Sequence, residues 1–388
     1  MKYRRFGKTE ERIPVISCGG MRFQESWKSG DPVSDASQRN LEACVRHAFE
    51  LGVNHFETAR GYGTSEYQLG KILPTMPRNE IIVQTKVGPE SDPAQFVANF
   101  ELSMELLGLD HVELFAIHGV NNEECYEDTL RCLDYALAWK KQGRIKSLGF
   151  STHGPTDVIV KTIALDVFDY VNLHWYYIFQ DNWPAVVEAN KRDMGVFIIS
   201  PNDKGGLLYK PTPKFTELCA PYHPMVFNGL FCLSRPEVHT LSCGVAKPED
   251  FDIHVETGEL SDRAAELVAP VVKRLDEEME RALGKEWLET WYLGLPEWED
   301  TPANINIPTI LRLRNLVLAF EMVEYGKMRY NLLGNGGHWF PGRNAAKLGE
   351  VDLSDCLRGA RHAARIPALI AETHGLLSGE EVKRLQRN

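Results

Sequence analysis

The stretch VELFAIHGVNNEECYEDTLRCLDYALAWKKQGRIKSLGF at 112–150 joins two short apolar segments through a longer amphipathic one. The segments 112–117 and 147–150 are apolar and rich in β-forming residues, whereas 126–137 repeats apolar residues at helical spacing. A parallel sheet needs such a helix, because the chain must return to the edge where the previous strand began. This stretch therefore predicts strand, helix and strand within an α/β fold.

The same alternation recurs along the first two thirds of the chain, where eight apolar runs are separated by helical patterns. The runs are 15–18, 53–56, 81–85, 112–117, 147–150, 170–173, 196–199 and 240–243. Three helical patterns end at glycines, which is typical of helix C-termini: Gly52, Gly108 and Gly143. The residues expected to face the sheet are Leu41, Cys44, Val45, Ala48, Phe96, Phe100, Met104, Leu107, Tyr126, Leu130, Leu133 and Leu137. Eight alternations predict a (β/α)8 TIM barrel, with a doubly wound open sheet as the alternative.

Composition limits the classes of function. A chain of 388 residues can hold one large barrel and an additional domain. Acidic residues outnumber basic ones by 54 to 43, and the net charge of −11 argues against a nucleic-acid partner. The eight cysteines form no C-x-x-C pair, no apolar run approaches membrane-spanning length, and the first residues lack the apolar core of a signal peptide. We therefore expect a cytoplasmic protein that does not span a membrane.

Residues suited to proton transfer are concentrated in HFETARGYGTSE at 55–66, where Glu57 and Tyr62 follow a short strand. Two later strands end in Lys86 and His118. All four fall at the carboxyl ends of predicted strands, the face where such barrels carry their active sites. An ammonium lowers the pKa of a nearby tyrosine by favouring the phenolate, and a carboxylate orients that ammonium. The set has the residue types needed to protonate a carbonyl oxygen while another group supplies hydride.

At these residues the chain resembles the aldo-keto reductase family, a set of NADPH-dependent carbonyl reductases built on a (β/α)8 barrel. The resemblance covers roughly residues 1–255, and the opening segment is similar to the family's N-terminal hairpin, which closes the barrel floor. The family's tetrad of Asp, Tyr, Lys and His matches Glu57, Tyr62, Lys86 and His118, with the spacing of five between the first two preserved. Glutamate in place of aspartate is a departure that keeps the charge and adds one methylene.

No G-x-G-x-x-G motif follows a strand in this chain, so a dinucleotide would have to be held by the rim of the barrel. The resemblance implies which residues of the rim bind it. Ser151 and Thr152, at the end of the fifth strand, are expected to bond the nicotinamide carboxamide, with Asn172 after the sixth strand as a third partner. Loops after strands seven and eight usually bind phosphate in this fold. The candidates there are Ser200, Lys204, Gly244 and Lys247. NADPH as the preferred cofactor is implied by the resemblance alone.

Aromatic residues follow two of the strands at the expected mouth of the barrel. The loop 19–32 holds Met21, Phe23 and Trp27, and HWYY at 174–177 follows the sixth strand. These rings either line a pocket for an apolar or planar carbonyl compound or pack at the rim, and the sequence leaves both interpretations open.

The alternation stops after about residue 260, which predicts a barrel at 1–260 and a helical domain at 261–388. Helical patterns at 261–283 and 307–326 support the second domain. Some aldo-keto reductases carry a ferredoxin-like tail with C-x2-C-x2-C-x3-C-P spacing, and this tail is similar in position and in its proline. The four ligand positions fall on residues that cannot bind such a cluster: Trp291, Gly294, Glu297 and Thr301. We expect a degenerate ferredoxin-like domain without an iron–sulfur cluster or another metal.

Two functional hypotheses follow. The first is an NADPH-dependent reductase of a small aldehyde or ketone, in which Tyr62 gives the proton, Lys86 and Glu57 tune Tyr62, and His118 orients the carbonyl group. The second is a cofactor-binding regulatory or interaction subunit with little turnover, motivated by the exchange of aspartate for glutamate and by the lost cluster ligands. Neither the physiological substrate nor the oligomeric state can be predicted from the sequence.

Overall fold

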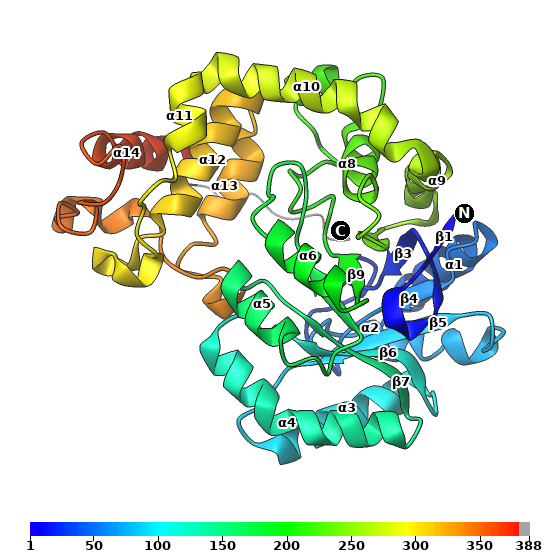
Figure 1. Cartoon of the computed structure of the whole chain (residues 1–388). Helices are drawn as coiled ribbons and strands as arrows, with labels where there is room; N and C mark the ends of the chain where they lie inside the picture. The colour runs from blue at the N-terminus through cyan, green and yellow to red at the C-terminus, as the bar shows by residue number, and fades with distance from the viewer. Residues whose placement is uncertain (380–388) are drawn as a thin grey trace. The chain divides into compact units, whose positions relative to one another are not determined.

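The computed structural model describes residues 1–379 and contains a closed barrel of eight parallel strands (Figure 1). The strands are β3 Ile16–Gly19, β4 His55–Glu57, β5 Ile82–Val87, β6 Val112–His118, β7 Ile145–Ser151, β8 Tyr170–Leu173, β9 Gly195–Ile198 and β10 Thr240–Gly244. Consecutive strands pair in parallel, and β10 pairs with β3 to close the ring. Each strand overlaps one of the eight predicted runs, with ends that differ by up to two residues. The predicted barrel is therefore confirmed, and the alternative of an open sheet is wrong.

Helices return the chain from the end of each strand to the start of the next. Those of the barrel are α1 Asp35–Glu50, α2 Ser65–Leu69, α3 Pro93–Leu107, α4 Glu123–Lys141, α5 Thr156–Ile163, α6 Trp183–Lys191, α8 Pro224–Leu233 and α9 Asp252–Leu260. Side chains of Ser34, Asp92 and Asn122 accept hydrogen bonds from the first turns of α1, α3 and α4. The predicted inward faces of α1 and α3 are buried. Short 3-10 helices occur at Gly7–Thr9, Leu73–Thr75, Pro248–Phe251, Ser261–Arg263, Trp298–Asp300, Pro302–Asn304, Gly337–Trp339 and Ala345–Glu350.

The inward face of α4 differs from the prediction. Tyr126 is buried as expected, but the three predicted leucines are exposed or only partly buried: Leu130, Leu133 and Leu137. The buried face instead runs through Thr129, Cys132, Ala136 and Trp139. The Trp139 indole stacks on the Phe100 ring with centroids 3.7 Å apart. Because an indole buries more apolar area than a leucine side chain, the position of Trp139 sets the rotation of α4.

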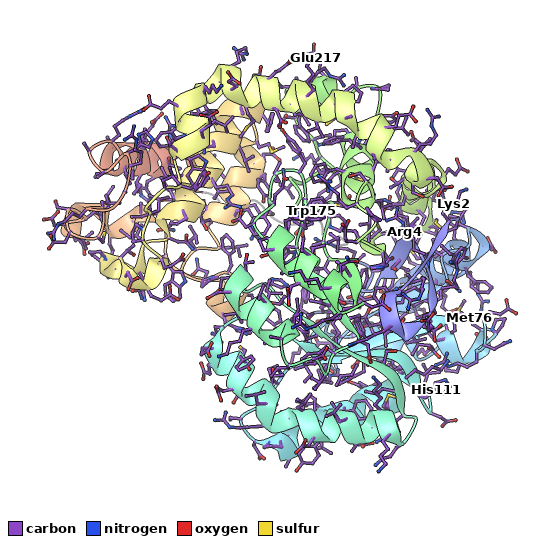
Figure 2. The ribbon with its side chains drawn as sticks, viewed as in Figure 1. Lys2, Arg4, Met76, His111, Trp175 and Glu217 are labelled. Carbon is purple, nitrogen blue, oxygen red and sulfur yellow. The ribbon has the colours of Figure 1, made fainter. Side chains whose placement is uncertain are left out.

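A hairpin of two strands, β1 Tyr3–Arg5 and β2 Arg12–Pro14, lies at the amino-terminal ends of the barrel strands. Phe6 follows β1 and packs against Gly195, where an added Cβ would lie 2.6 Å from the ring. Arg4, labelled in Figure 2, donates a hydrogen bond of 2.8 Å to the carbonyl of Leu233. The hairpin therefore closes the barrel floor, as the resemblance implied, and leaves the carboxyl ends of the strands as the mouth.

Within the described residues, contacts divide the chain into two compact units, one of residues 1–205 and 225–268 and one of residues 206–224 and 269–379. The predicted boundary near residue 260 stays a prediction. Helices wholly or largely in the second unit are α7 Pro213–Cys219, α10 Ala264–Leu283, α11 Lys285–Thr290, α12 Ile307–Phe320, α13 Val323–Tyr330 and α14 Ile366–Leu377.

The apolar pattern predicted as one helix at 307–326 forms two helices, α12 and α13. The break lies at Glu321, which has a left-handed backbone conformation with φ of 59° and so ends α12. The residues expected on the apolar face of α12 are buried: Ile310, Leu313, Val317 and Phe320. The second unit therefore has a core of its own, in which Phe320 packs edge-on against Phe215 of α7.

Candidate active site

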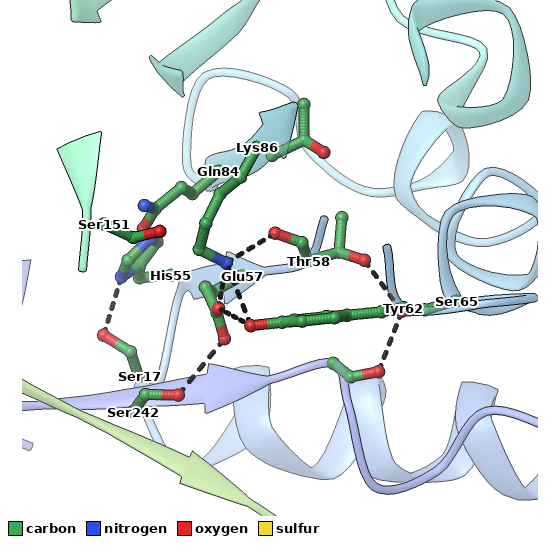
Figure 3. A network of polar contacts seen from close by, with 12 residues as sticks. Ser17, His55, Glu57, Thr58, Tyr62, Ser65, Gln84, Lys86, Ser151 and Ser242 are labelled. Carbon is green, nitrogen blue, oxygen red and sulfur yellow. Dashed lines mark hydrogen bonds and ion pairs between the residues drawn. The ribbon is translucent and has the colours of Figure 1, made fainter. Parts of the chain in front are cut away.

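Three of the predicted catalytic side chains meet in one polar network at the mouth of the barrel (Figure 3). The Lys86 ammonium forms a close ion pair with Oε1 of Glu57 and donates a hydrogen bond of 2.7 Å to the carbonyl of Thr58. The Tyr62 hydroxyl lies 3.3 Å from the same Oε1 atom and 3.5 Å from Lys86 Nζ. The His118 ring stands edge-on to the Tyr62 ring, with centroids 5.6 Å apart. The structure therefore brings all four residues together.

Strand ends and one close loop contact place these side chains. Glu57 is the last residue of β4, and Lys86 is the next-to-last residue of the neighbouring β5. Tyr62 lies in the following loop, just before Gly63, whose φ of 55° suits glycine. An added Cβ at Gly63 would lie 1.9 Å from the carbonyl oxygen of Ser26. Only glycine lets the loop after β3 pack this closely beside Tyr62.

Burial separates the charged pair from the two rings. Glu57 and Lys86 are 2% and 1% exposed, whereas Tyr62 and His118 are partly exposed. A buried ion pair with its polar atoms engaged is held in one geometry, because leaving either charge without a partner costs several kcal/mol. The phenol and the imidazole are consequently the members of the network that can touch a bound molecule.

The expected direction of the Tyr62 pKa is wrong. Burial, followed by the charge and the hydrogen bond of Glu57, raises the pKa of Tyr62 well above its usual value, against an opposing effect of Arg22. Burial lowers the pKa of Lys86, although Glu57 acts in the other direction. The prediction counted only the ammonium. The longer glutamate places its oxygen beside the phenol as well, so the carboxylate charge also disfavours the phenolate.

Lys204 lies in the loop after β9 and contacts two histidines that the sequence did not single out. Its ammonium is 2.9 Å from Nδ1 of His153 and 3.2 Å from Nε2 of His174. The Tyr176 hydroxyl donates to a backbone carbonyl and therefore accepts from Nδ1 of His174. This places the His174 proton on Nδ1 and leaves Nε2 to accept from Lys204. The Lys204 ammonium thus lies within hydrogen-bonding distance of both imidazole rings.

The other predicted phosphate-binding residues lie at or after the ends of the neighbouring strands β9 and β10. Ser200 has a left-handed backbone with φ of 53°, and Lys247 is exposed before the helical turn that follows β10. Gly244 is covered by Arg22, whose Cγ would lie 2.6 Å from an added Cβ. Arg22 in turn forms a buried ion pair of 2.9 Å with Asp203. This pair joins the loops that follow β3 and β9.

Several contacting residues escaped the sequence analysis for different reasons. His174, which directly follows β8, obeys the strand-end pattern that identified His118, and applying that pattern to every strand would have found it. Ser242, which donates to Glu57, is the third of five residues in β10, so the strand-end pattern does not mark it. Arg22 and Asp203 lie in loops that are far apart in the sequence, one after β3 and one after β9. No local sequence pattern therefore marks them as an ion pair.

A comparison with known proteins assigns the chain to a family. The model of the aldo/keto reductase family matches residues 15–210, just over half of the chain. The chain belongs to the aldo/keto reductase family. The match begins at the barrel's first strand and includes all four residues of the network described above.

Curated aldo/keto reductase relatives match part of the chain. The L-glyceraldehyde 3-phosphate reductase of Escherichia coli (strain K12) is 28% identical over 171 residues, which cover 40% of this chain and 46% of that protein. The L-galactose dehydrogenase of Arabidopsis thaliana is 27% identical over 180 residues, which cover 44% and 51%. The chain thus spans about half the length of the curated relatives it matches.

Solved aldo/keto reductase structures share the fold. The holo form of an aldo-keto reductase from Bacillus halodurans has a TM-score of 0.60 at 19% identity, covering 71% of this chain and 96% of that one. An aldo-keto reductase from Klebsiella pneumoniae in complex with NADPH has a TM-score of 0.53 at 16% identity, covering 69% and 93%. At such low identity these structures support the shared barrel alone.

Residues at the ends of β7 and β8 fit the carboxamide of a nicotinamide cofactor. Asn172 pairs in register with Ser151 and is fully buried, yet neither atom of its amide has a hydrogen-bond partner within residues 1–379. A buried amide without partners is costly, and a carboxamide supplies the missing donor and acceptor. The Ser151 hydroxyl accepts from the N–H of Gly119 at 3.1 Å and keeps its own proton to donate. Thr152, by contrast, uses its hydroxyl in the local turn, donating to a carbonyl and accepting from an N–H.

The aromatic residues near the mouth mostly pack into the barrel. Phe23, Trp175 and Tyr177 are buried, and Trp175 stacks on Phe231 with centroids 4.8 Å apart. Trp27 is 48% exposed. For the buried rings the structure favours the packing interpretation, and Trp27 is the ring with area left to contact a ligand.

Two further features of the described residues concern metals and membranes. Residues 1–379 contain no group of three or more His, Cys, Asp or Glu side chains arranged to hold a metal ion. None of the helices in that part of the chain is both long and apolar enough to span a bilayer.

Proposed function

We propose that this chain is an NADPH-dependent reductase that converts an aldehyde or a ketone into an alcohol. The observation that carries the proposal is the position of the Tyr62 hydroxyl, which contacts the buried Lys86–Glu57 pair while its ring is partly exposed at the mouth. Membership of the aldo/keto reductase family supports the same reaction class.

The chain's own groups can manage the proton. When bound, the reduced nicotinamide supplies hydride to the carbonyl carbon. The Tyr62 hydroxyl donates its proton to the carbonyl oxygen, and His118 beside it orients that oxygen. The contact from Tyr62 to Glu57 is 3.3 Å, longer than a normal O–H···O hydrogen bond, so the hydroxyl can turn towards a better acceptor at small cost.

The protonation states suit reduction. Because the pKa of Tyr62 is raised by burial and by Glu57, the phenol keeps its proton throughout the neutral range. The acid form is the one that reduction needs. Once the proton has left, the ammonium of Lys86 at 3.5 Å stabilises the phenolate until water returns a proton.

The direct test is oxidation of NADPH, followed by its absorbance, with purified protein and a panel of carbonyl compounds. L-glyceraldehyde 3-phosphate and the oxidised form of L-galactose belong in the panel, since the names of two relatives refer to these sugars. We expect turnover with at least one aldehyde, and a loss of about 10²–10⁴-fold in the Tyr62→Phe variant. Tyr67→Phe is the matched control, because Tyr67 is exposed in the next helix.

The rival is a cofactor-binding subunit with little turnover. It is favoured if the protein binds NADPH in a fluorescence titration but oxidises it with no member of the panel. Equal rates in the parent and the Tyr62→Phe variant would instead leave the reaction class in place and remove Tyr62 as the proton donor. Parallel assays with NADH measure the cofactor preference.

A further inference from the structure

Ser242 lies on the opposite side of Glu57 from the lysine and the tyrosine. It is the third residue of β10, and its hydroxyl donates a hydrogen bond of 3.1 Å to Oε2 of Glu57 (Figure 3). The other oxygen, Oε1, serves Lys86 and Tyr62. The two oxygens of one carboxylate therefore have different partners, so the contact at Oε2 determines the rotation that presents Oε1.

Space for this contact exists because residue 19 is glycine. Gly19 ends β3, between β10 and β4, and pairs in register with Glu57. An added Cβ on Gly19 would lie 2.7 Å from the Ser242 hydroxyl and 3.4 Å from Oε2 of Glu57. A side chain there would occupy the room in which the hydroxyl and the carboxylate meet.

The length of glutamate is what makes the contact reach. An aspartate at position 57 would shorten the side chain by about 1.5 Å, one carbon–carbon bond. A carboxylate withdrawn by that amount and held by Lys86 would lie too far from Ser242 for a hydrogen bond. Gly19, Glu57 and Ser242 thus form a matched set.

We propose that Ser242 is a positioning residue for proton donation, which acts by fixing the rotation of the Glu57 carboxylate in the space left by Gly19. It touches neither the reacting atoms nor Tyr62. The inference rests on the proposed function, because it concerns the same proton donor. It also predicts that the serine matters only when residue 57 is a glutamate.

The first experiment compares Ser242→Ala with Ser242→Thr, which keeps the hydroxyl. Loss of a hydrogen bond to a charged group predicts a fall in kcat of roughly 10-fold for Ser242→Ala, with the NADPH dissociation constant unchanged. Ser242→Thr should recover most of the loss. Ser147→Ala is the matched control, because Ser147 is a buried serine of β7 with no bond to the network. A parental kcat in Ser242→Ala overturns the proposal.

The second experiment repeats Ser242→Ala in a Glu57→Asp background. The expected result is no further loss, because the shorter carboxylate does not reach the serine. Gly19→Ala in the parental chain should reproduce the loss of Ser242→Ala, and in the Glu57→Asp chain it should be tolerated. Equal losses from Ser242→Ala in both backgrounds would mean that the serine acts through some other group, which also overturns the proposal.

A third measurement separates this inference from the proposed function, because it needs no turnover. Ionisation of Tyr62 is followed by ultraviolet difference titration, with the Tyr62→Phe variant subtracted. The charged groups that act on this phenol are Glu57, Lys86 and Arg22. Ser242→Ala should ionise Tyr62 at lower pH, because a carboxylate free to rotate disfavours the phenolate less. Identical titrations in the parent and the variant would refute the positioning role even in a protein that reduces nothing.

Discussion

Two of the buried carboxylates, Glu57 and Glu113, lie towards opposite ends of the barrel and are held in opposite ways. Glu113, the second residue of β6, lies towards the floor and is 2% exposed, like Glu57 at the mouth. Three basic side chains surround it, Arg78 at 2.9 Å, Lys146 at 3.1 Å and His111 at 3.3 Å. Figure 2 labels His111. Among residues 1–379, Glu57 forms an ion pair with Lys86 alone, and one of its oxygens contacts both that cation and the Tyr62 phenol.

The number of basic partners determines how strongly a buried carboxylate is stabilised. Although burial acts to raise it, hydrogen bonds from Arg78, the Val83 N–H and Lys146 lower the pKa of Glu113 below its usual range. If Glu113 loses one of its basic partners, the others still compensate its charge. Glu57 contacts one cation, one phenol and one serine, so removing any of these changes how the carboxylate acts on the remaining two.

The largest expected effect comes from removing the single cation at the mouth. Lys86→Met leaves Glu57 buried without a counter-charge, which should cost about 3–5 kcal/mol of stability at neutral pH. Because protonation removes the uncompensated charge, the loss should shrink as pH falls. Urea unfolding at several pH values measures this. A loss independent of pH would contradict the assignment of Lys86 as the charge that compensates Glu57.

Removing one cation from Glu113 near the barrel floor should lower the free energy of unfolding by a smaller amount. Arg78→Met removes one of several partners of Glu113, and we expect a cost of about 1–3 kcal/mol with turnover per folded molecule unchanged. The depressed pKa of Glu113 gives stability that is present above its unfolded pKa and lost as pH falls through the folded value. Acid unfolding should therefore begin at higher pH in the variant. A cost equal to that of Lys86→Met would erase the contrast between the two ends.

Glu57→Gln tests the shared oxygen without removing the side chain. Glu57 raises the pKa of both Tyr62 and Lys86, so its neutral replacement should lower both. Because the proposed reduction needs the protonated phenol, the pH above which the reduction rate falls should be lower in Glu57→Gln than in the parent. Glu57→Asp keeps the charge but loses the Ser242 contact, so it should lower that pH by less than Glu57→Gln does. A pH–rate profile of Glu57→Gln that overlays the parental one would show that the carboxylate and the phenol are not coupled.

The smallest expected effect concerns the uncharged part of the mouth. Asn172→Ala removes an amide that can make neutral hydrogen bonds, so NADPH binding should weaken by about 2- to 12-fold, the equivalent of ~0.5–1.5 kcal/mol. Fluorescence titration measures it. The protein itself should become no less stable, because the amide has no partner among residues 1–379 to lose. A destabilised variant with parental affinity would place Asn172 in the fold instead of the cofactor site.

The barrel is predictable from the sequence because both faces of its strands are buried, which leaves continuous apolar runs such as 114–117. The four tetrad residues are predictable because each lies at or just after a strand end, where the fold makes distant segments converge. The rotation of α4 cannot be predicted from the sequence, since it depends on the contact of Trp139 with Phe100 of another helix. The direction of the Tyr62 pKa shift cannot be predicted for a similar reason. It depends on which oxygen of Glu57 faces the phenol, a matter of ångströms that residue types do not encode.

The contact between Ser242 and Glu57 crosses the seam where the last strand of the barrel meets the first. The two residues are 185 positions apart in the chain, and β10 must pair with β3 before they can approach. Closing so long a loop is among the slowest and latest kinds of event in folding. A partly folded chain that lacks this last pairing can already hold Lys86 beside Glu57, but its Glu57 carboxylate lacks the partner at Oε2. If Ser242 positions the proposed proton donor, that donor becomes fully oriented only when the barrel closes.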